Sequence, residues 1–299
     1  MSNRAGYPLY AAINISTRCN LDCKYCYMQP RSELDMNLKD FKKVMDDLYE
    51  NSLFYVQISG GEPFIHPEFI EIVEYASSKI KDISILTNGT LVLEEHLEFL
   101  RDVTKRIPLK IQVSIDSLYS EVNQRTRNVK SEVILENIKK LSKTGVILAA
   151  GMVVTKHNIN TLIESILNLK EYIKFFHIMC IQNTEYDSRL EKMLKPDINE
   201  LESLWNELDI IQKQYDLKIS KPRDLELSNY KGCAYGAPCA AAFSYVVIDP
   251  DLNVRPCDKL NSIILGNMKK NNLKTIWNSD ITNKFLNNET PLCIHKRDG

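Results

Sequence analysis

The sequence lacks an excess of charge of either sign and lacks a long apolar run. Its 38 Lys and Arg residues nearly balance its 39 Asp and Glu residues, and the net charge of −1 gives no support to a nucleic-acid or anionic-membrane partner. The longest apolar stretch, residues 146–154, is far shorter than the roughly 20 residues of a membrane-spanning helix. Residues 1–16 lack the charged, apolar and cleavage regions of a signal peptide. We therefore expect a cytoplasmic protein that does not enter a membrane.

Disulfides are not expected either, although the chain contains eight cysteines, because the cytoplasm keeps thiols reduced. The cysteines are unevenly placed. Three lie within residues 18–27, Cys180 stands alone, and four occupy the last quarter of the chain. This distribution indicates two sets of metal ligands, whereas Cys180 is interpreted as a small buried hydrophobic residue on a strand.

Short apolar runs alternate with segments whose apolar residues recur at helical spacing. Six such strand–helix units in succession predict a parallel sheet, and 299 residues suffice for an α/β fold built as a partial (β/α)6 TIM-like barrel. The expected strands are residues 9–16, 53–59, 82–87, 109–115, 147–155 and 175–182, and the expected helices are residues 38–50, 67–80, 93–105, 131–145, 160–173 and 197–215.

The unusual residues of the sequence follow the ends of the predicted strands. "CNLDCKYC" (19–26) follows the first strand, "GGEP" (60–63) the second and "TNG" (87–89) the third, while Ser114 and Asp116 close the fourth. In a barrel, the loops after the carboxyl ends of the strands converge on one mouth, where the chemistry takes place. The sequence therefore predicts one site at that mouth, and the missing part of the barrel predicts an opening at its side.

Cys19, Cys23 and Cys26 place three thiols in a C-x₃-C-x₂-C pattern. Zinc prefers four tetrahedral ligands, and a zinc site here would need a fourth ligand from elsewhere in the fold. A [4Fe–4S] cluster normally takes four thiolates, so with three its fourth iron keeps an open position. A ligand that carries both an amino and a carboxylate group could chelate that iron. The cysteine pattern alone leaves both open, and the motifs that follow it favour the open cluster over zinc.

The "SGGEP" stretch has the residue types that such a ligand needs. Gly60 and Gly61 carry no Cβ, so their backbone can approach a bound molecule closely. Glu62 offers a carboxylate to an ammonium group. The alternative is a simple strand-to-helix turn with Pro63 near the start of the helix.

Taken together, C-x₃-C-x₂-C, the aromatic residue before its third cysteine and the GGEP stretch resemble the radical S-adenosylmethionine (SAM) superfamily over residues 9–182. The resemblance implies that the three cysteines hold a [4Fe–4S] cluster whose open iron binds SAM. Reductive cleavage of SAM would then give a 5′-deoxyadenosyl radical that abstracts a substrate hydrogen. The cofactor-binding residues that the motifs imply are Tyr25, Gly60, Gly61 and Glu62.

The same resemblance extends to residues after the fourth strand. Ser114 matches a position that contacts the ribose or methionine part of SAM, and "EVNQRTR" places Arg127 on the SAM carboxylate, with Arg125 as a rival. Asp116 is interpreted either as a ribose ligand or as a cap of the following turn. Asn88 is interpreted as a turn residue in preference to a ligand.

Residues 218–299 break the alternation, so we expect a barrel domain of residues 1–217 followed by a small α+β domain. The recurring pieces "IDPD", "RPC", "LGN" and "IW" make this tail similar to the SPASM/twitch extension of radical SAM enzymes. The resemblance implies one auxiliary [4Fe–4S] cluster, and a zinc ion is the alternative. The implied ligands are Cys233, Cys239, Cys257 and Cys293.

Residues 243–249 and 253–257 of the tail predict a hairpin around "PDLN", and residues 271–278 predict a short helix. Leu252 stands where the family usually has glycine. We therefore expect Asn253 to take the positive φ angle in this turn.

The resemblance implies a radical SAM oxidoreductase that oxidises or crosslinks a peptide made by the ribosome. One alternative is a small metabolite as substrate: a sugar, a tetrapyrrole or a cofactor precursor. Another is a non-catalytic iron–sulfur electron carrier or a zinc-binding module, which Glu62 and the two glycines argue against. No residue is identified as the proton acceptor.

The expected partners follow from the same interpretation. A flavodoxin- or ferredoxin-like protein would supply the electron that reduces the cluster. Only 18 residues precede Cys19, so we expect no fused peptide-recognition domain before it and predict a separate recognition protein or direct binding in the barrel opening.

Overall fold

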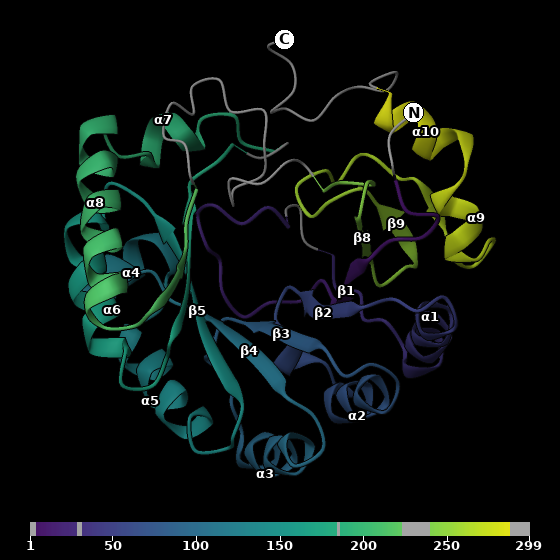
Figure 1. The fold of residues 1–299 in the computed structure, drawn as a ribbon, viewed down its shortest axis with the longest axis horizontal. Helices are drawn as coiled ribbons and strands as arrows, with labels where there is room; N and C mark the ends of the chain where they lie inside the picture. The colour runs from purple at the N-terminus through teal and green to yellow at the C-terminus, as the bar shows by residue number, and fades with distance from the viewer. Residues whose placement is uncertain (1–3, 29–31, 184–185, 223–239, 288–299) are drawn as a thin grey trace.

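The computed structural model describes residues 4–28, 32–183, 186–222 and 240–287. These residues form one curved sheet of ten strands in the order β10-β9-β8-β1-β2-β3-β4-β5-β6-β7 (Figure 1). Strands β1 to β7 pair in parallel, and β8 pairs in parallel with β1. The strands are β1 Tyr10–Ser16, β2 Tyr55–Gly60, β3 Ile83–Thr87, β4 Leu109–Ser114, β5 Ile147–Val154, β6 Phe175–Cys180, β7 Lys218–Ser220, β8 Tyr245–Ile248, β9 Asn253–Arg255 and β10 Gly266–Asn267.

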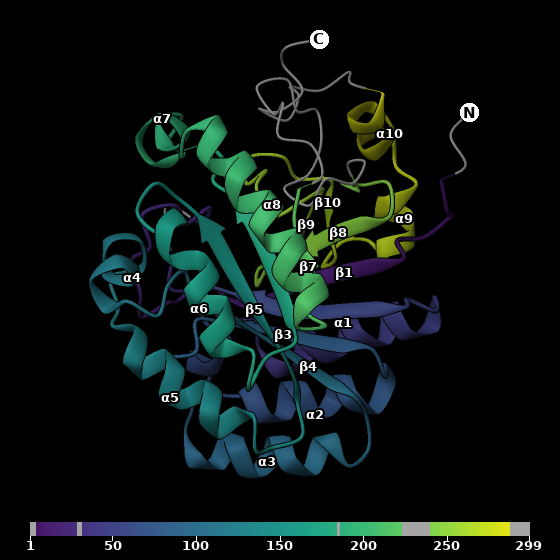
Figure 2. The same ribbon diagram turned by 60° about the vertical axis from the view of Figure 1, so that its left-hand side comes forward.

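Helices cover the outer side of the sheet, as Figures 1 and 2 show from two directions. They connect successive parallel strands, so the prediction of a partial (β/α)6 TIM-like barrel is confirmed. The helices are α1 Leu38–Glu50, α2 Phe69–Lys79, α3 Glu94–Thr104, α4 Ser120–Arg127, α5 Ser131–Leu141, α6 Leu162–Leu169, α7 Leu190–Leu194, α8 Ile198–Gln214, α9 Leu273–Trp277 and α10 Asp280–Leu286, with the 3-10 turns η1 Pro63–Ile65 and η2 Ile159–Thr161.

Helix α1 illustrates why these segments fold as they do. Asn37 caps its start, because the side-chain oxygen accepts a hydrogen bond from the backbone N–H of Asp40 at 2.9 Å. The apolar side chains on one face are buried against the sheet, and each such burial contributes about 1.5–3 kcal/mol. These residues are Phe41, Val44, Met45 and Leu48.

Two elements were not expected from the sequence, one of them beside the predicted site. Helix α4 contains the "EVNQRTR" stretch, and β7 adds a seventh parallel strand beside β6. Cys180 is the last residue of β6 and packs against the core while partly buried, in keeping with its interpretation as a small hydrophobic residue. Its burial raises the pKa of the thiol to about 11.

The described part of the tail continues the barrel sheet. Strand β8 pairs with β1, and β9 and β10 follow it as antiparallel neighbours. The predicted hairpin and short helix are present as β8–β9 and α9. The expected boundary between residues 217 and 218 falls at the start of β7 and stays a prediction.

The expectation for the hairpin turn was wrong, because Leu252 and not Asn253 has the positive φ angle, at 69°. A left-handed conformation costs a residue with a Cβ about 1–2 kcal/mol. The Leu252 side chain is fully buried in the core, which offsets that cost. Asn253 is the first residue of β9, where extended backbone is required, and its side chain bonds Asp251 at 2.6 Å.

Candidate active site

The four loops that carry the unusual residues meet at the carboxyl ends of β1 to β4. The Asn88 side chain after β3 donates to Asn20 Oδ1 at 2.9 Å and lies 3.8 Å from the sulfur of Cys19. The loop after β1 also contacts the segment after β4, because the hydroxyl of Tyr25 donates to Asp116. The prediction that these loops share one mouth is therefore confirmed.

The three N-terminal cysteines lie in a loop whose backbone is bonded to α4. All three are partly exposed, and none forms a disulfide with another described residue. The backbone N–H of Lys24 donates to the carbonyl of Thr126 at 2.9 Å, which ties the middle of the loop to α4. Burial raises the pKa of the Cys23 thiol to about 11, although the positive charge of Arg127 opposes the shift. The raised pKa favours the protonated thiol at neutral pH.

Glu62 is fully buried and joins two of the loops. One oxygen accepts hydrogen bonds from Thr87 Oγ1 at 2.7 Å and from the backbone N–H of Phe64 at 3.1 Å. The other accepts from the backbone N–H of Asn88 at 2.6 Å. Burial raises the pKa of Glu62 to about 7 in spite of these bonds, which favour the ionised form. Its contact with an ammonium group stays a prediction.

Gly60 and Gly61 allow a close approach between two segments of the chain itself. A Cβ on Gly60, whose φ is +136°, would overlap the carbonyl oxygen of Ser16, and one on Gly61 would overlap that of Arg18. The same contact contains two hydrogen bonds of 2.8 Å, from Gly61 N to Ser16 O and from Glu62 N to Arg18 O. The glycines thus fix the backbone that leads into Cys19, and their approach to a bound molecule stays a prediction.

Asp116, Arg127 and Tyr25 form a buried cluster beside the cysteine loop. Asp116 Oδ2 accepts from the hydroxyls of Tyr25 and Thr126 and lies 3.2 Å from Arg127 Nε, while Oδ1 accepts from the backbone N–H of Val153 at 3.0 Å. The guanidinium lies 5.6 Å from the Tyr25 ring centre. Burial alone would lower the pKa of Arg127, but the charge of Asp116 raises it above its ordinary value.

The interpretation of Asp116 as a cap of the following turn was wrong. The cap is the hydroxyl of Ser117, which accepts from the backbone N–H of Tyr119 at 3.1 Å. The carboxylate of Asp116 is engaged instead by Tyr25 and the other groups of the buried cluster. Contact of Asp116 with a ribose stays a prediction.

The remaining N-terminal candidates differ in their placement. Arg127 faces inward, whereas its rival Arg125 is exposed on α4. Ser114 closes β4 and is partly buried. Asn88 is a turn residue as expected, since its side-chain oxygen accepts from Thr90 N at 2.9 Å, and it also contacts the cysteine loop.

Sequence reasoning missed three polar residues that connect the loops: Asn20, Thr87 and Thr126. Asn20 bonds Asn88, Thr87 bonds Glu62, and Thr126 bonds Asp116. Thr87 and Asn20 stand inside motifs that the sequence did single out, so proximity to the motifs was an available signal. Thr126 was detectable only once "EVNQRTR" had been recognised as a helix packed on the cysteine loop.

Of the four predicted auxiliary ligands, Cys257 lies within the described residues, and Cys233, Cys239 and Cys293 lie outside them. Cys257 follows β9 and packs, partly buried, against the core. The backbone around it is held by Arg255, whose guanidinium donates to the carbonyl of Cys257 at 3.3 Å.

The donors of the cysteine loop are three thiols, the ligand type that holds a [4Fe–4S] cluster. In the part of the chain that the structure describes, no three His, Cys, Asp or Glu side chains converge on a single point. A cubane presents separate irons to its ligands, so its thiolates need not meet at a point. The Leu21 N–H donates to Cys19 Sγ at 3.5 Å, an interaction that tunes cluster sulfurs. Arg127 Nε lies 3.2 Å from Asp116 Oδ2, so the buried cation beside the loop is paired with that carboxylate.

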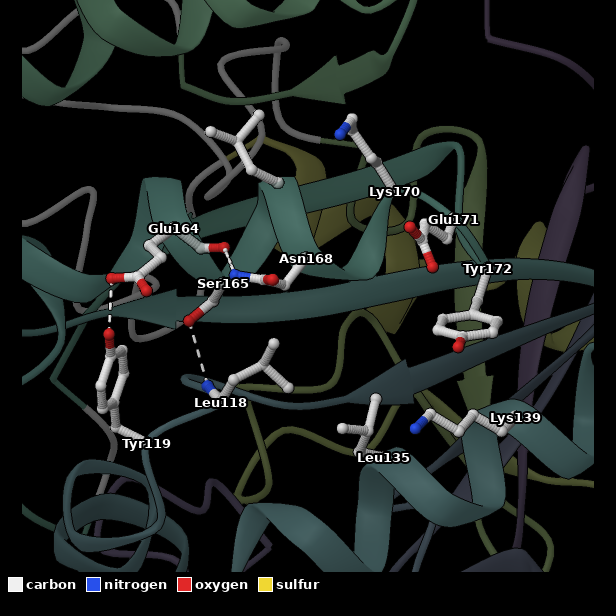
Figure 3. A pocket seen from close by; sticks show the side chains of 11 residues that line it. Leu118, Tyr119, Leu135, Lys139, Glu164, Ser165, Asn168, Lys170, Glu171 and Tyr172 are labelled. Carbon is white, nitrogen blue, oxygen red and sulfur yellow. Dashed lines mark hydrogen bonds between the residues drawn. The ribbon is translucent and has the colours of Figure 1, made fainter.

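A hollow of about 490 Å³ lies elsewhere, on the outer side of the barrel between α5 and α6 (Figure 3). Ser165 Oγ accepts there from the backbone N–H of Leu118 at 3.0 Å, and Tyr119 donates to Glu164 at 2.5 Å. These two hydrogen bonds join α6 to the segment before α4. Leu118 and Tyr119 belong to the loop after β4, and the other residues that line the hollow lie outside the four loops of the predicted site.

Comparison with protein-family models finds two matches. The radical SAM superfamily model matches residues 13–166, and a SPASM model, described as an iron–sulfur cluster-binding domain, matches residues 239–295. The chain belongs to the radical SAM superfamily. Membership implies a [4Fe–4S] cluster and SAM at the barrel mouth, and the SPASM match implies a further iron–sulfur cluster in the tail.

Similar proteins include the antilisterial bacteriocin subtilosin biosynthesis protein AlbA of Bacillus subtilis, which is 28% identical over 97% of this chain and 64% of its own length. The chain therefore spans less than two thirds of this relative. The Fe-coproporphyrin III synthase of Methanosarcina barkeri is 29% identical over 66% of this chain and 49% of its own length. The solved structure of SuiB from Streptococcus suis, bound to S-adenosylmethionine, shares the fold with a TM-score of 0.79 at 20% identity, over 95% of this chain and 68% of SuiB.

Among the helices in the described ranges, none combines the length and the apolar character needed to cross a membrane. This agrees with the short apolar runs of the sequence.

Proposed function

We propose that this chain cleaves SAM reductively and uses the resulting 5′-deoxyadenosyl radical to oxidise or crosslink a peptide made by the ribosome. The observation that carries the proposal is the meeting of the cysteine loop with the GGEP and TNG loops at the barrel mouth, in a member of the radical SAM superfamily. Peptide as the substrate is supported by the similarity to AlbA, named for the biosynthesis of the bacteriocin subtilosin. SuiB, which has the same fold, has been solved bound to the precursor peptide SuiA.

The proposed roles follow the positions of the residues. Cys19, Cys23 and Cys26 would hold the cluster, which supplies the electron that cleaves SAM when both are bound. Arg127 would bind the SAM carboxylate, because it faces the mouth beside the cysteine loop and Asp116 keeps its guanidinium charged. Ser114, Tyr25 and the GGEP backbone would position the rest of SAM at the same mouth. The four tail cysteines would hold the auxiliary cluster.

Asp116 receives a different role from the one its motif position implied. Tyr25, Thr126 and Val153 donate to its carboxylate, and Arg127 pairs with it. We assign it the positioning of Tyr25 and Arg127. Burial first, and then the charge of Asp116, raise the pKa of the Tyr25 hydroxyl well above its ordinary value, so Tyr25 remains the hydrogen-bond donor.

The test is to incubate the anaerobically reconstituted, reduced protein and SAM with peptides encoded beside its gene. Peptide products lighter by two hydrogens per modification, with deuterium moved from a labelled side chain into 5′-deoxyadenosine, are expected. The Cys23→Ala variant is the control and should release no 5′-deoxyadenosine. Turnover confined to a tetrapyrrole, as the similarity to Fe-coproporphyrin III synthase would allow, or to a sugar would replace the peptide proposal. Absence of SAM cleavage would overturn the whole function.

A further inference from the structure

The side chain of Asn261 bonds the loop that carries Cys26 to the C-terminal tail. Its Nδ2 donates to the backbone carbonyl of Tyr27 at 2.6 Å, across 234 positions of sequence. Tyr27 directly follows Cys26, the third of the proposed cluster ligands. Asn261 lies four residues after Cys257, the proposed auxiliary ligand that the structure describes.

The orientation of the Asn261 amide is set by what lies at its other end. Its Oδ1 accepts from Arg255 Nη1 at 2.6 Å. A guanidinium only donates hydrogen bonds, so the amide oxygen must face Arg255 and the NH₂ group must face the carbonyl of Tyr27. Both ends of the amide are therefore used, and reversing it would break both bonds.

Arg255 is itself fixed in the interior of the molecule. It is 3% exposed and binds Asp249 through two hydrogen bonds of 2.5 and 2.7 Å. The same guanidinium donates to the backbone carbonyls of Cys257 and Asp258 at 3.3 and 3.1 Å. One buried cation thus sets the backbone at Cys257 and the side chain that holds the Cys26 loop.

This ion pair is also connected to the barrel. Asn14 of β1 donates to Asp249 Oδ1 at 2.9 Å, and β1 leads directly into the cysteine loop. The loop is consequently held by α4 on one side, through Lys24 and Thr126, and by the tail on the other, through Tyr27 and Asn261.

We propose that Asn261, oriented by Arg255, is a positioning residue that couples the backbone of the SAM-cluster loop to the backbone that presents Cys257. The position of the Cys26 loop relative to the Cys257 segment is then fixed by this amide. A displacement of either segment is transmitted to the other through it. A role of Asn261 in catalysis rests on the proposed function, because both concern the same site. The coupling itself is measurable without catalysis.

The sharpest variant is Asn261→Asp. An aspartate still accepts from Arg255, but it has no donor for the carbonyl of Tyr27, so the variant removes the link and spares the guanidinium contact. Asn267→Asp is the matched control. Asn267 lies in the same tail and donates to Asp251 O at 3.1 Å and Asn253 Oδ1 at 2.9 Å, all within the tail.

Hydrogen–deuterium exchange of the full chain without metal tests the coupling. In Asn261→Asp, amides of residues 19–28 should exchange about five-fold faster, the factor expected for loss of one ordinary hydrogen bond. Asn267→Asp should leave them unchanged. Unchanged exchange in Asn261→Asp, or an equal rise in both variants, would overturn the proposal.

A second measurement uses the reconstituted protein. The electron paramagnetic resonance signal of the reduced SAM cluster should shift in Asn261→Asp and keep its parental form in Asn267→Asp. An identical signal in the parent and in Asn261→Asp, together with a changed exchange rate, would reduce Asn261 to a purely structural residue and overturn its positioning role. If the enzyme did not modify a peptide, the exchange and resonance measurements would still report on Asn261. The two proposals can therefore be overturned independently.

Discussion

At the scale of single residues, the most consequential group is a carboxyl that the fold buries completely. Glu62 connects the GGEP loop to the TNG loop and has a pKa of about 7, against 4.5 in its ordinary environment. A folded-state pKa above the unfolded value means that the folded chain holds a proton which the unfolded chain has lost. Between these two values, stability must therefore fall as the pH rises.

The variant Glu62→Gln should remove this dependence. In the metal-free parent protein, the contribution of Glu62 to the free energy of unfolding should drop by about 3 kcal/mol between pH 4.5 and pH 7. Above pH 7 this contribution should no longer change with pH. In the variant that component should be absent. Urea unfolding at pH 4.5, 6 and 8 gives the free energy of unfolding of both proteins. If this free energy changed with pH equally in the two, Glu62 would not be a buried carboxyl that holds a proton.

Asp116→Asn tests the buried pair with Arg127, whose side chains are 0% and 7% exposed. Removing one partner of a buried pair leaves an uncompensated charge, which costs about 3–5 kcal/mol. Asp102→Asn is the control, since its pair with Lys105 lies on the surface and little change is expected. Equal unfolding free energies for the two variants would refute the role of the buried pair. Loss of SAM affinity in Asp116→Asn alone is also expected, because Tyr25 and Arg127 both depend on it.

At the scale of the elements, the contact between the end of β1 and the loop after β2 determines how the chain enters the cysteine loop. Glycine is required there because another piece of backbone occupies the place of a Cβ. The glycines of the GGEP stretch, which the sequence assigns to ligand binding, are therefore also required by the packing of two backbone segments.

Gly61→Ala should disturb that contact. The added methyl would meet the carbonyl of Arg18, and overpacking of this kind costs about 1–3 kcal/mol. Gly6→Ala is the matched control, since nothing lies within 4 Å of its added Cβ. We expect Gly61→Ala to lower the melting temperature and the iron taken up by the first cluster, measured by calorimetry and iron analysis. Parental behaviour of Gly61→Ala would show that the backbone contact is dispensable.

At the scale of the whole molecule, the barrel and the described part of the tail share one sheet, since β8 pairs with β1. The tail therefore lies beside the strand that precedes the cysteine loop. This arrangement places the Cys257 segment within hydrogen-bonding reach of the Cys26 loop.

Iron analysis tests the two-cluster organisation. Two cubanes give about eight Fe per chain, and replacing the tail ligands together by Ala should leave about four. SAM cleavage without substrate should survive in that variant, whereas product formation should fall. Cys180→Ala, outside both sets, should keep all the iron. Stoichiometric zinc in the anaerobically purified parent, or full iron in the quadruple variant, would contradict the auxiliary cluster. The four replaced residues are Cys233, Cys239, Cys257 and Cys293.

The sequence alone predicted the barrel and the place of the site. Apolar periodicity is local, so the six strand–helix units could be recognised from neighbouring residues, and parallel strands bring their carboxyl ends to one mouth in any such barrel. The spacing of Cys19, Cys23 and Cys26 and the GGEP stretch are local patterns too, which is why the family could be recognised from them.

Only the tertiary structure decided how the site is held. The bonds of Glu62 to Asn88, of Tyr25 to Asp116 and of Asn261 to Tyr27 join residues 26, 91 and 234 positions apart. The burial that offsets the strained backbone of Leu252 likewise depends on distant segments. Hydrogen bonding and burial are properties of neighbours in space, and no local pattern encodes which neighbours a buried polar group will meet.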